Sequence, residues 1–241
     1  MTLDGTRILL VGGTSGLGLA VAQAAAERGA TPIVASRNPA GVDRALGALP
    51  ERAEGATVDV GDTGSIARLV EHAGPIDHLV YTAGEPLQLT MLPDLTPEIA
   101  RSFWETRYFG ALGVVRAVTV AGAVREGGSI VLTGGNAGQR PGPGWSLAAS
   151  VCGAMEALTR QLALELAPLR VNLVAPGVTR SPLWAGMSRG DEQALYDGLA
   201  ATLPAGRVGE PSDVALAYLY AMEQPMATGT SILVDGGAVL V

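Results

Sequence analysis

Short, nearly continuous apolar runs alternate with longer segments of helical periodicity along the whole chain. Strands that are buried on both faces of a parallel sheet show such continuous runs, whereas half-exposed strands alternate apolar with polar residues. The pattern therefore predicts an α/β fold with a doubly wound parallel sheet of about seven strands and helices on both faces. The predicted strands are 7–11, 31–36, 56–59, 76–82, 129–133, 171–175 and 231–234, and the predicted helices are 16–28, 41–49, 63–73, 97–124, 145–167, 191–201 and 212–222.

No repeat, linker or low-complexity segment interrupts this pattern, so residues 1–241 are expected to form a single domain. The net charge of −7 argues against nucleic acid or an anionic membrane as a partner. A single cysteine, Cys152, excludes an internal disulfide. The start of the sequence shows neither a charged leader nor a long apolar stretch, which favours a cytoplasmic protein. His72 and His78 lack partners at ligand spacing, so no metal site is expected.

A glycine-rich turn joins the first predicted strand to the first predicted helix. Glycine permits a tight turn, a close approach of backbone to phosphate, and close packing of the helix on the strand. The free N–H groups at the start of the helix then face the phosphate. In this position the turn predicts a dinucleotide pyrophosphate site on a Rossmann-like fold. The turn reads Gly12-Gly13-Thr14-Ser15-Gly16-Leu17-Gly18.

The glycine spacing resembles that of the short-chain dehydrogenase/reductase family, and family-like segments recur over essentially the whole chain. The resemblance implies that Asp59 and Val60 contact the adenine. It also implies that the loop after the sixth strand holds the nicotinamide carboxamide through the Thr179 backbone and the Ser181 hydroxyl. The cofactor-binding residues implied in this way are Gly12, Thr14, Ser15, Gly16, Leu17, Gly18, Ser36, Arg37, Asp59, Val60, Ala83, Gly84, Pro176, Gly177, Thr179 and Ser181.

The end of the second predicted strand indicates which nicotinamide cofactor is used. Members that prefer NAD carry an acidic residue there, which holds the ribose 2′-hydroxyl. This chain has Ser36 followed by Arg37. A carboxylate would repel a 2′-phosphate, whereas a hydroxyl and a guanidinium bind one. The expected cofactor is therefore NADP(H), with a solvated surface arginine as the alternative interpretation of Arg37.

The catalytic positions depart from the family pattern. Family members use a tyrosine acid, a lysine that lowers its pKa, a serine that orients the substrate and an asparagine in a proton relay. The chain contains no lysine, since all 16 of its basic residues are arginine. Aligned on the flanking segments, the positions of the tyrosine, lysine, serine and asparagine are taken by Ala148, Cys152, Gly135 and Arg107.

Two of these replacements are candidates for chemistry. Arg107 is the candidate catalytic residue, because a guanidinium can bind a carboxylate, an enolate or a carbonyl oxygen. The alternative is an arginine that fills the space of the missing lysine and hydrogen-bonds nearby backbone. Cys152 is a candidate thiol acid or nucleophile, but a lone helical cysteine is more often a small buried residue.

The sequence is compatible with two functions. One is an NADP(H)-dependent oxidoreductase with a rebuilt site, acting on a small carbonyl, enone or quinone-like molecule. The other is a catalytically inactive NADP(H)-binding sensor or partner protein. The segment 182–211 has the place and length of a substrate lid, which favours the enzyme. Trp145 and Trp184 either flank a substrate pocket or pack in the core. Long Ala/Leu/Val-rich helices and an apolar C-terminus predict a homo-oligomer, a dimer or a tetramer.

Overall fold

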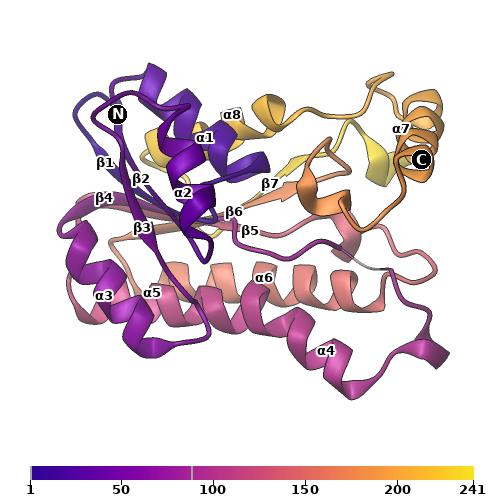
Figure 1. Cartoon of the computed structure of the whole chain (residues 1–241), viewed down its shortest axis with the longest axis horizontal. Helices are drawn as coiled ribbons and strands as arrows, with labels where there is room; N and C mark the ends of the chain where they lie inside the picture. The colour runs from indigo at the N-terminus through magenta and orange to yellow at the C-terminus, as the bar shows by residue number, and fades with distance from the viewer. Residues whose placement is uncertain (1, 88) are drawn as a thin grey trace.

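A seven-stranded parallel sheet forms the centre of the protein, as seen in a computed structural model that describes residues 2–87 and 89–241. Its strand order is β3-β2-β1-β4-β5-β6-β7. Helices pack on both faces of the sheet (Figure 1), so the predicted fold class is confirmed. The strands are β1 (Arg7–Val11), β2 (Thr31–Ser36), β3 (Glu54–Thr57), β4 (Ile76–Tyr81), β5 (Val124–Thr133), β6 (Arg170–Pro176) and β7 (Ser231–Val234).

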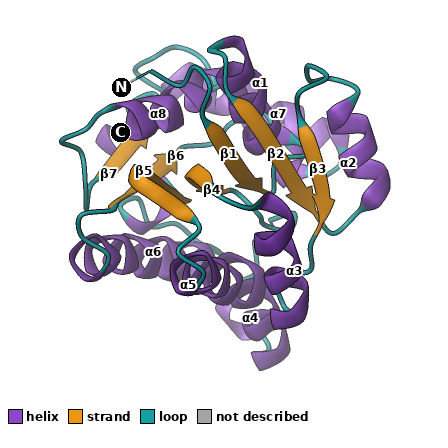
Figure 2. Cartoon of the chain, turned by 90° about the vertical axis from the view of Figure 1, so that its left-hand side faces the viewer, coloured by secondary structure: helices purple, strands orange, loops and turns teal. Residues whose placement is uncertain are grey.

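The helices divide between the two faces of the sheet (Figure 2). One face carries α1 (Gly16–Glu27), α2 (Pro39–Leu46) and α8 (Pro211–Glu223), and the other carries α3 (Thr63–Ala73), α5 (Ala111–Val120) and α6 (Ser146–Glu165). Helix α4 (Pro97–Trp104) continues the line of α5, and α7 (Arg189–Thr202) lies near the C-terminus. Short 3₁₀ turns occur at Leu92–Asp94, Asn136–Gly138, Pro182–Trp184 and Ala238–Leu240.

The continuous apolar runs fill two cores at once. In β1, Ile8 and Leu10 pack toward α1 and α8, whereas Leu9 and Val11 pack toward α3, α5 and α6. All four side chains are at most 1% exposed. Successive side chains of a strand point to opposite faces, so a strand covered on both sides needs an apolar residue at every position. The packing explains why the runs in the sequence show no alternation.

The predicted helix 97–124 is wrong in two respects. A π-helical segment, Glu105–Gly110, separates α4 from α5, and the helix ends at Val120. The chain turns at Gly122, whose φ of 58° favours glycine and ends the helix. Strand β5 then begins at Val124, which pairs with Ile76, whereas the sequence pattern predicts its start at Ser129.

Smaller corrections concern the second helix and the third strand. Helix α2 begins at Pro39, because the fixed φ of proline suits the first helical position. Strand β3 begins at Glu54 and ends at Thr57, before the predicted 56–59 segment ends. The polar Glu54 fits the strand because its carboxylate pairs with the Arg7 guanidinium at 2.6 Å. Among the described residues, no helix combines the length and the apolar character that a membrane span requires.

Candidate functional site

A cleft of about 460 Å³ lies where the strand order changes direction, at the carboxyl ends of the strands. Doubly wound sheets bind their ligands at this place because the loops of the two halves diverge there. All of the predicted cofactor-binding residues except Asp59 line the cleft, as does Arg107. The structure therefore brings together residues from the first loop of the chain to the loop after β6.

The glycine turn forms the floor of the cleft. Gly12 has a φ of 92°, and a Cβ placed on it would lie 2.5 Å from the backbone N of Ala83. Gly16, with a φ of 49°, begins α1, and its Cβ would lie 3.2 Å from Cδ of Pro182. No side chain caps the start of α1, so its first N–H groups, in residues that line the cleft, have no side-chain partner. This cradle of backbone without side chains fits the pyrophosphate of a dinucleotide.

Asp59 lies outside the main cleft. Strand β3 ends two residues earlier, and the Asp59 carboxylate accepts a hydrogen bond from the backbone N–H of Gly61 at 3.0 Å. It lines a second hollow of about 270 Å³, which it shares with Arg37 and Glu85. Val60, the next residue, does line the main cleft. The adenine contact expected of Val60 fits this placement, and that of Asp59 stays a prediction.

Ser36 and Arg37 stand at the end of β2, on the rim of the cleft. The Arg37 side chain is 61% exposed, and its Nη2 lies 3.2 Å from Oε1 of Glu85. The Glu85 carboxylate also accepts a hydrogen bond from the Thr106 hydroxyl at 3.0 Å. Sequence reasoning missed Glu85 and Thr106. The position of Glu85 directly after the Ala83-Gly84 segment was the available signal.

Arg107 lies in the π-helical segment and points into the cleft. Its Nη2 donates a hydrogen bond to the backbone carbonyl of Glu85, and its guanidinium carbon lies 4.0 Å from the ring centroid of Phe103. Its Nη1 is buried and has no hydrogen-bond partner among the described residues. Burial lowers the pKa of Arg107, although nearby Glu85 opposes that shift. Phe103 was also missed, although its place one helical turn before Arg107 indicated the contact.

Tyr81 lies beside the cleft, but its hydroxyl is engaged. The hydroxyl donates a hydrogen bond to the Thr106 carbonyl within the π-helical segment. Burial raises the pKa of Tyr81, so its proton is held more tightly than in water. A Cβ on Gly110 would lie 2.6 Å from the same hydroxyl, which explains the glycine at the end of the segment. Tyr81 thus supports the backbone that carries Arg107.

The residues that align with the family's catalytic tyrosine, lysine and serine lie together at the inner end of the cleft. Ala148 and Cys152 lie one turn apart on α6, and both line the cleft with Gly135. A Cβ on Gly135 would lie 3.1 Å from Sγ of Cys152. Burial raises the pKa of the Cys152 thiol to about 11, so the thiol is protonated at neutral pH. This environment favours a packing role for Cys152.

Aromatic and aliphatic side chains line the outer part of this end. The rings of Trp145 and Trp184 meet edge to face, with centroids 6.3 Å apart. Leu87 and Phe103 also line the cleft, and the Leu87 N–H donates to the Leu183 carbonyl at 2.7 Å. Both tryptophans therefore face the cleft while packing on each other. The cleft offers an apolar ligand a large contact area beside the Arg107 guanidinium.

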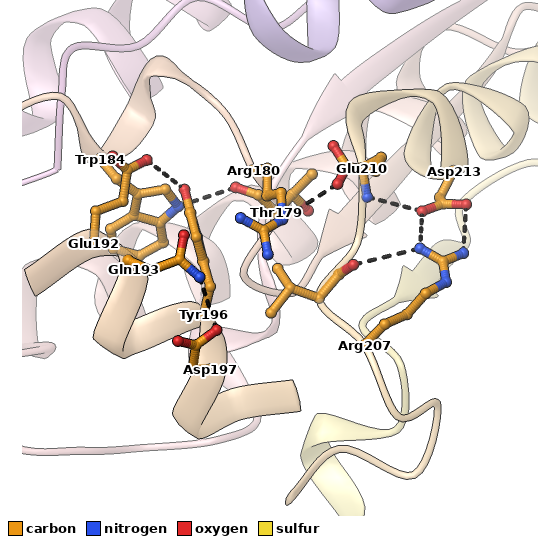
Figure 3. Close-up of polar contacts among 11 residues, drawn as sticks. Thr179, Arg180, Trp184, Glu192, Gln193, Tyr196, Asp197, Arg207, Glu210 and Asp213 are labelled. Atoms are coloured by element: carbon orange, nitrogen blue, oxygen red, sulfur yellow. Dashed lines mark hydrogen bonds and ion pairs between the residues drawn. The ribbon is translucent and has the colours of Figure 1, made fainter. Parts of the chain in front are cut away.

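The segment proposed as a lid is tied to its base by polar contacts (Figure 3). The Trp184 indole N–H donates to the Thr179 carbonyl at 3.0 Å. The Arg180 guanidinium carbon lies 4.4 Å from the Tyr196 ring centroid, and its Nε lies 3.3 Å from Oε1 of Glu210. Only Pro182–Trp184, at the start of the segment, borders the cleft. The role of the segment as a lid stays a prediction.

Among the described residues, no group of three or more histidine, cysteine, aspartate or glutamate side chains is arranged to hold a metal ion.

Comparisons with known proteins agree with this geometry. A family model described as enoyl-(acyl carrier protein) reductase matches residues 11–239. The chain is 36% identical to the short-chain dehydrogenase/reductase ATR9 of Stachybotrys chlorohalonatus over 99% of both chains. It is 33% identical to the short-chain dehydrogenase/reductase malC of Malbranchea aurantiaca, over 99% of this chain and 96% of that one.

Solved structures extend the likeness to three dimensions. The MalC reductase/Diels-Alderase superposes with a TM-score of 0.91 at 32% identity, covering 99% of this chain and 98% of that one. A small-chain dehydrogenase in complex with NADPH superposes with a TM-score of 0.84 at 34% identity, covering 99% of this chain and 100% of that one. An NADPH-bound short-chain oxidoreductase of Pseudomonas aeruginosa with an atypical catalytic center gives 0.89 at 26% identity, covering 97% of each chain. The dinucleotide cradle, the strand order and these relatives together show that the chain belongs to the short-chain dehydrogenase/reductase family.

Proposed function

We propose that this protein is an NADP(H)-dependent oxidoreductase in which Arg107 stands in for the usual tyrosine–lysine pair. The buried Nη1 of Arg107, which has no hydrogen-bond partner, carries the proposal. An unsatisfied donor in a buried site costs free energy unless a ligand oxygen completes it. The NADPH complexes of two similar structures, and Ser36 and Arg37 at the end of β2, support the choice of cofactor.

The residues present fit the cofactor along the length of the cleft. The glycine turn would hold the pyrophosphate, Ser36 and Arg37 the 2′-phosphate, and Pro176 to Ser181 the nicotinamide side. When bound, the nicotinamide supplies or accepts hydride. The proposed role of Arg107 is to stabilise the negative charge that develops on the substrate oxygen. Phe103, on which its guanidinium lies, limits the movement of that side chain.

The substrates that suit this site need little help from a protein acid. A quinone, or an enone reduced at its β-carbon, places the negative charge on a delocalised oxygen, which then takes a proton from solvent. A simple ketone needs a proton at the alkoxide that forms, and general acid catalysis of that step is commonly worth about 10²- to 10⁴-fold. The proposed substrates are therefore small, largely apolar quinones or activated enones.

The test measures NADPH oxidation with a quinone, an enone and a simple ketone of similar size. Turnover of the first two, with little turnover of the ketone, is expected. Arg107→Ala should lower turnover of the enone by about 10²-fold, which is typical for the loss of one donor to a developing oxyanion. Arg116→Ala is the matched control, because Arg116 is exposed on α5. Equal turnover by Arg107→Ala and the native chain would show that Arg107 has only a structural role.

The second candidate is an NADP(H)-binding protein without catalysis. The absence of an ionisable side chain at Gly135 and Ala148, together with the protonated thiol of Cys152, favours it. Tight NADPH binding without oxidation of the cofactor by any acceptor in the panel would support this candidate over the enzyme.

A further inference from the structure

We propose that Glu85 sets how strongly the protein prefers NADPH to NADH, by competing with the nucleotide 2′-phosphate for the Arg37 guanidinium. The inference rests on the proposed cofactor and concerns a residue that the dinucleotide motif does not include.

Glu85 occupies the boundary between the two hollows of the site. It follows the Ala83-Gly84 segment, which walls the main cleft, and it lines the second hollow as well. Its backbone carbonyl accepts a hydrogen bond from Arg107, which fixes the main chain at this point. Its side chain extends toward the end of β2, where the 2′-phosphate is expected. The carboxylate thus belongs to the part of the site that distinguishes the two nucleotides.

The carboxylate is held in place more firmly than the guanidinium that it contacts. Oε1 of Glu85 accepts a hydrogen bond from the buried Thr106 hydroxyl at 3.0 Å and lies 3.2 Å from Nη2 of Arg37. The Glu85 side chain is 31% exposed, whereas the Arg37 side chain is 61% exposed. In the part of the chain that the structure describes, Glu85 is the only acidic group that forms an ion pair with Arg37.

Competition follows from the charges. A phosphate and a carboxylate both accept hydrogen bonds from a guanidinium, and two anions at one guanidinium repel each other. The 2′-phosphate must therefore share Arg37 with Glu85 or displace it. A 2′-hydroxyl carries no charge and makes no such demand, so binding of NADH is affected little. Glu85 consequently moderates a preference that Ser36 and Arg37 would otherwise make stronger.

The opposite role would be support, in which Glu85 holds Arg37 in the position that binds phosphate. The two roles predict opposite changes in the affinity for NADPH when the charge of Glu85 is removed. Glu85→Gln keeps the size of the side chain and an oxygen for Thr106 but removes the charge. Competition predicts tighter binding of NADPH by this variant, whereas support predicts weaker binding.

The experiment measures the dissociation constants of NADPH and NADH by titration, following energy transfer from tryptophan to the reduced nicotinamide. The native chain is compared with Glu85→Gln, Arg37→Gln and the double variant. Glu85→Gln should bind NADPH about three- to tenfold more tightly and change NADH by less than about twofold. In the Arg37→Gln background the gain should shrink to less than about twofold, because no guanidinium remains to compete for.

Glu71→Gln is the matched control. Glu71 is exposed on α3 and lines neither hollow. It should leave both dissociation constants within about twofold of native. Weaker binding of NADPH by Glu85→Gln, no change, or an undiminished gain in the Arg37→Gln background would each overturn the proposal. Failure of the native chain to bind either nucleotide, or equal binding of both with no effect of Arg37→Gln, would instead refute the proposed cofactor.

Discussion

At the scale of single residues, burial raises the pKa values of Tyr81 and Cys152 and lowers that of Arg107. Each shift disfavours the charged form of the group, as desolvation does. The tyrosine and the cysteine therefore retain their protons at neutral pH. For Arg107 the shift is opposed by Glu85, and guanidinium has so high an intrinsic pKa that it stays charged. The cleft thus offers a fixed positive charge rather than a mobile proton.

His78 makes stability depend on pH. Burial lowers the pKa of His78 from 6.5 to about 4, and its Nδ1 lies 2.9 Å from the Ser129 hydroxyl. Below pH 6.5 the unfolded chain binds a proton at His78 that the folded chain does not bind. The free energy of unfolding therefore has its full value above pH 6.5 and decreases as the pH falls toward 4. The free energy of unfolding decreases by about 3 kcal/mol over this range. Urea unfolding at a series of pH values should show it.

A control for this prediction is available in the same chain. His78→Gln should flatten the decline between pH 6.5 and 4, whereas His72→Gln should not, because His72 is exposed on α3. Identical pH profiles for the native chain and His78→Gln would show that other groups cause the decline.

At the scale of elements, the π-helical segment between α4 and α5 links a buried strand to the cleft. Single π turns often occur at functional sites because the extra residue redirects side chains. Here the segment contains Arg107. The Thr106 carbonyl of the same segment accepts a hydrogen bond from the Tyr81 hydroxyl, at the end of β4. The core of the sheet therefore fixes the place of the guanidinium.

Gly110→Ala tests this link. The added Cβ would lie 2.6 Å from the Tyr81 hydroxyl and 2.7 Å from Cγ2 of Val60, so the segment must shift. Overpacking of this kind costs about 1–3 kcal/mol of unfolding free energy. Gly198→Ala in α7 is the control, since its Cβ meets nothing within 4 Å and alanine favours helix. Chemical denaturation of both variants measures the difference, and equal stabilities would contradict the link.

A second test at this scale rebuilds the family pair on α6. Ala148→Tyr with Cys152→Lys places a phenol and an amine one turn apart at the inner end of the cleft. If the cleft accepts the usual geometry, reduction of simple ketones should rise by about 10²-fold or more over the native chain. NADPH oxidation with a ketone measures it, with Ala148→Phe and Cys152→Lys as the control that lacks the hydroxyl. Equal rates in both variants would show that the rebuilt hydroxyl does not act as the acid.

The sequence was sufficient to predict the features that depend on local periodicity and on the backbone freedom of glycine. The strand runs and the glycine turn are of this kind, since Gly12 and Gly16 both need conformations that favour glycine. Contacts between distant segments were not predictable. The pairing of Arg37 with Glu85 joins the ends of β2 and β4, and the hydrogen bond from Tyr81 joins a strand to a helix interior. Such contacts depend on tertiary packing, for which periodicity carries no signal.

At the scale of the whole molecule, large apolar side chains remain exposed on helices of both faces. They include Leu164 on α6 and Val120 on α5, which are 77% and 75% exposed, and Leu216 and Tyr220 on α8, which are 59% and 49% exposed. Exposed apolar side chains that gather on a helix face are typical of association surfaces. Two such faces on one chain suit an assembly with more than one twofold axis.

We therefore expect a homo-oligomer, and a tetramer in particular. Sedimentation velocity at micromolar concentration, with and without NADPH, measures the mass directly. Leu164→Glu should shift the distribution toward smaller species, because a charge in an apolar interface is costly to bury. Glu165→Gln on the same helix is the control. A native chain that sediments as a stable monomer would contradict this prediction.

The strand order also governs how the chain can fold as it is synthesised. The partners of β1 are β2, which follows it closely, and β4, which ends at Tyr81. Until β4 has left the ribosome, β1–β3 form a partial sheet in which β1 is an edge strand, with apolar side chains and unpaired backbone groups along one side. Unpaired strand edges of this kind are where nascent chains aggregate. Nascent chains from which β4 has not yet emerged should therefore depend most on chaperones.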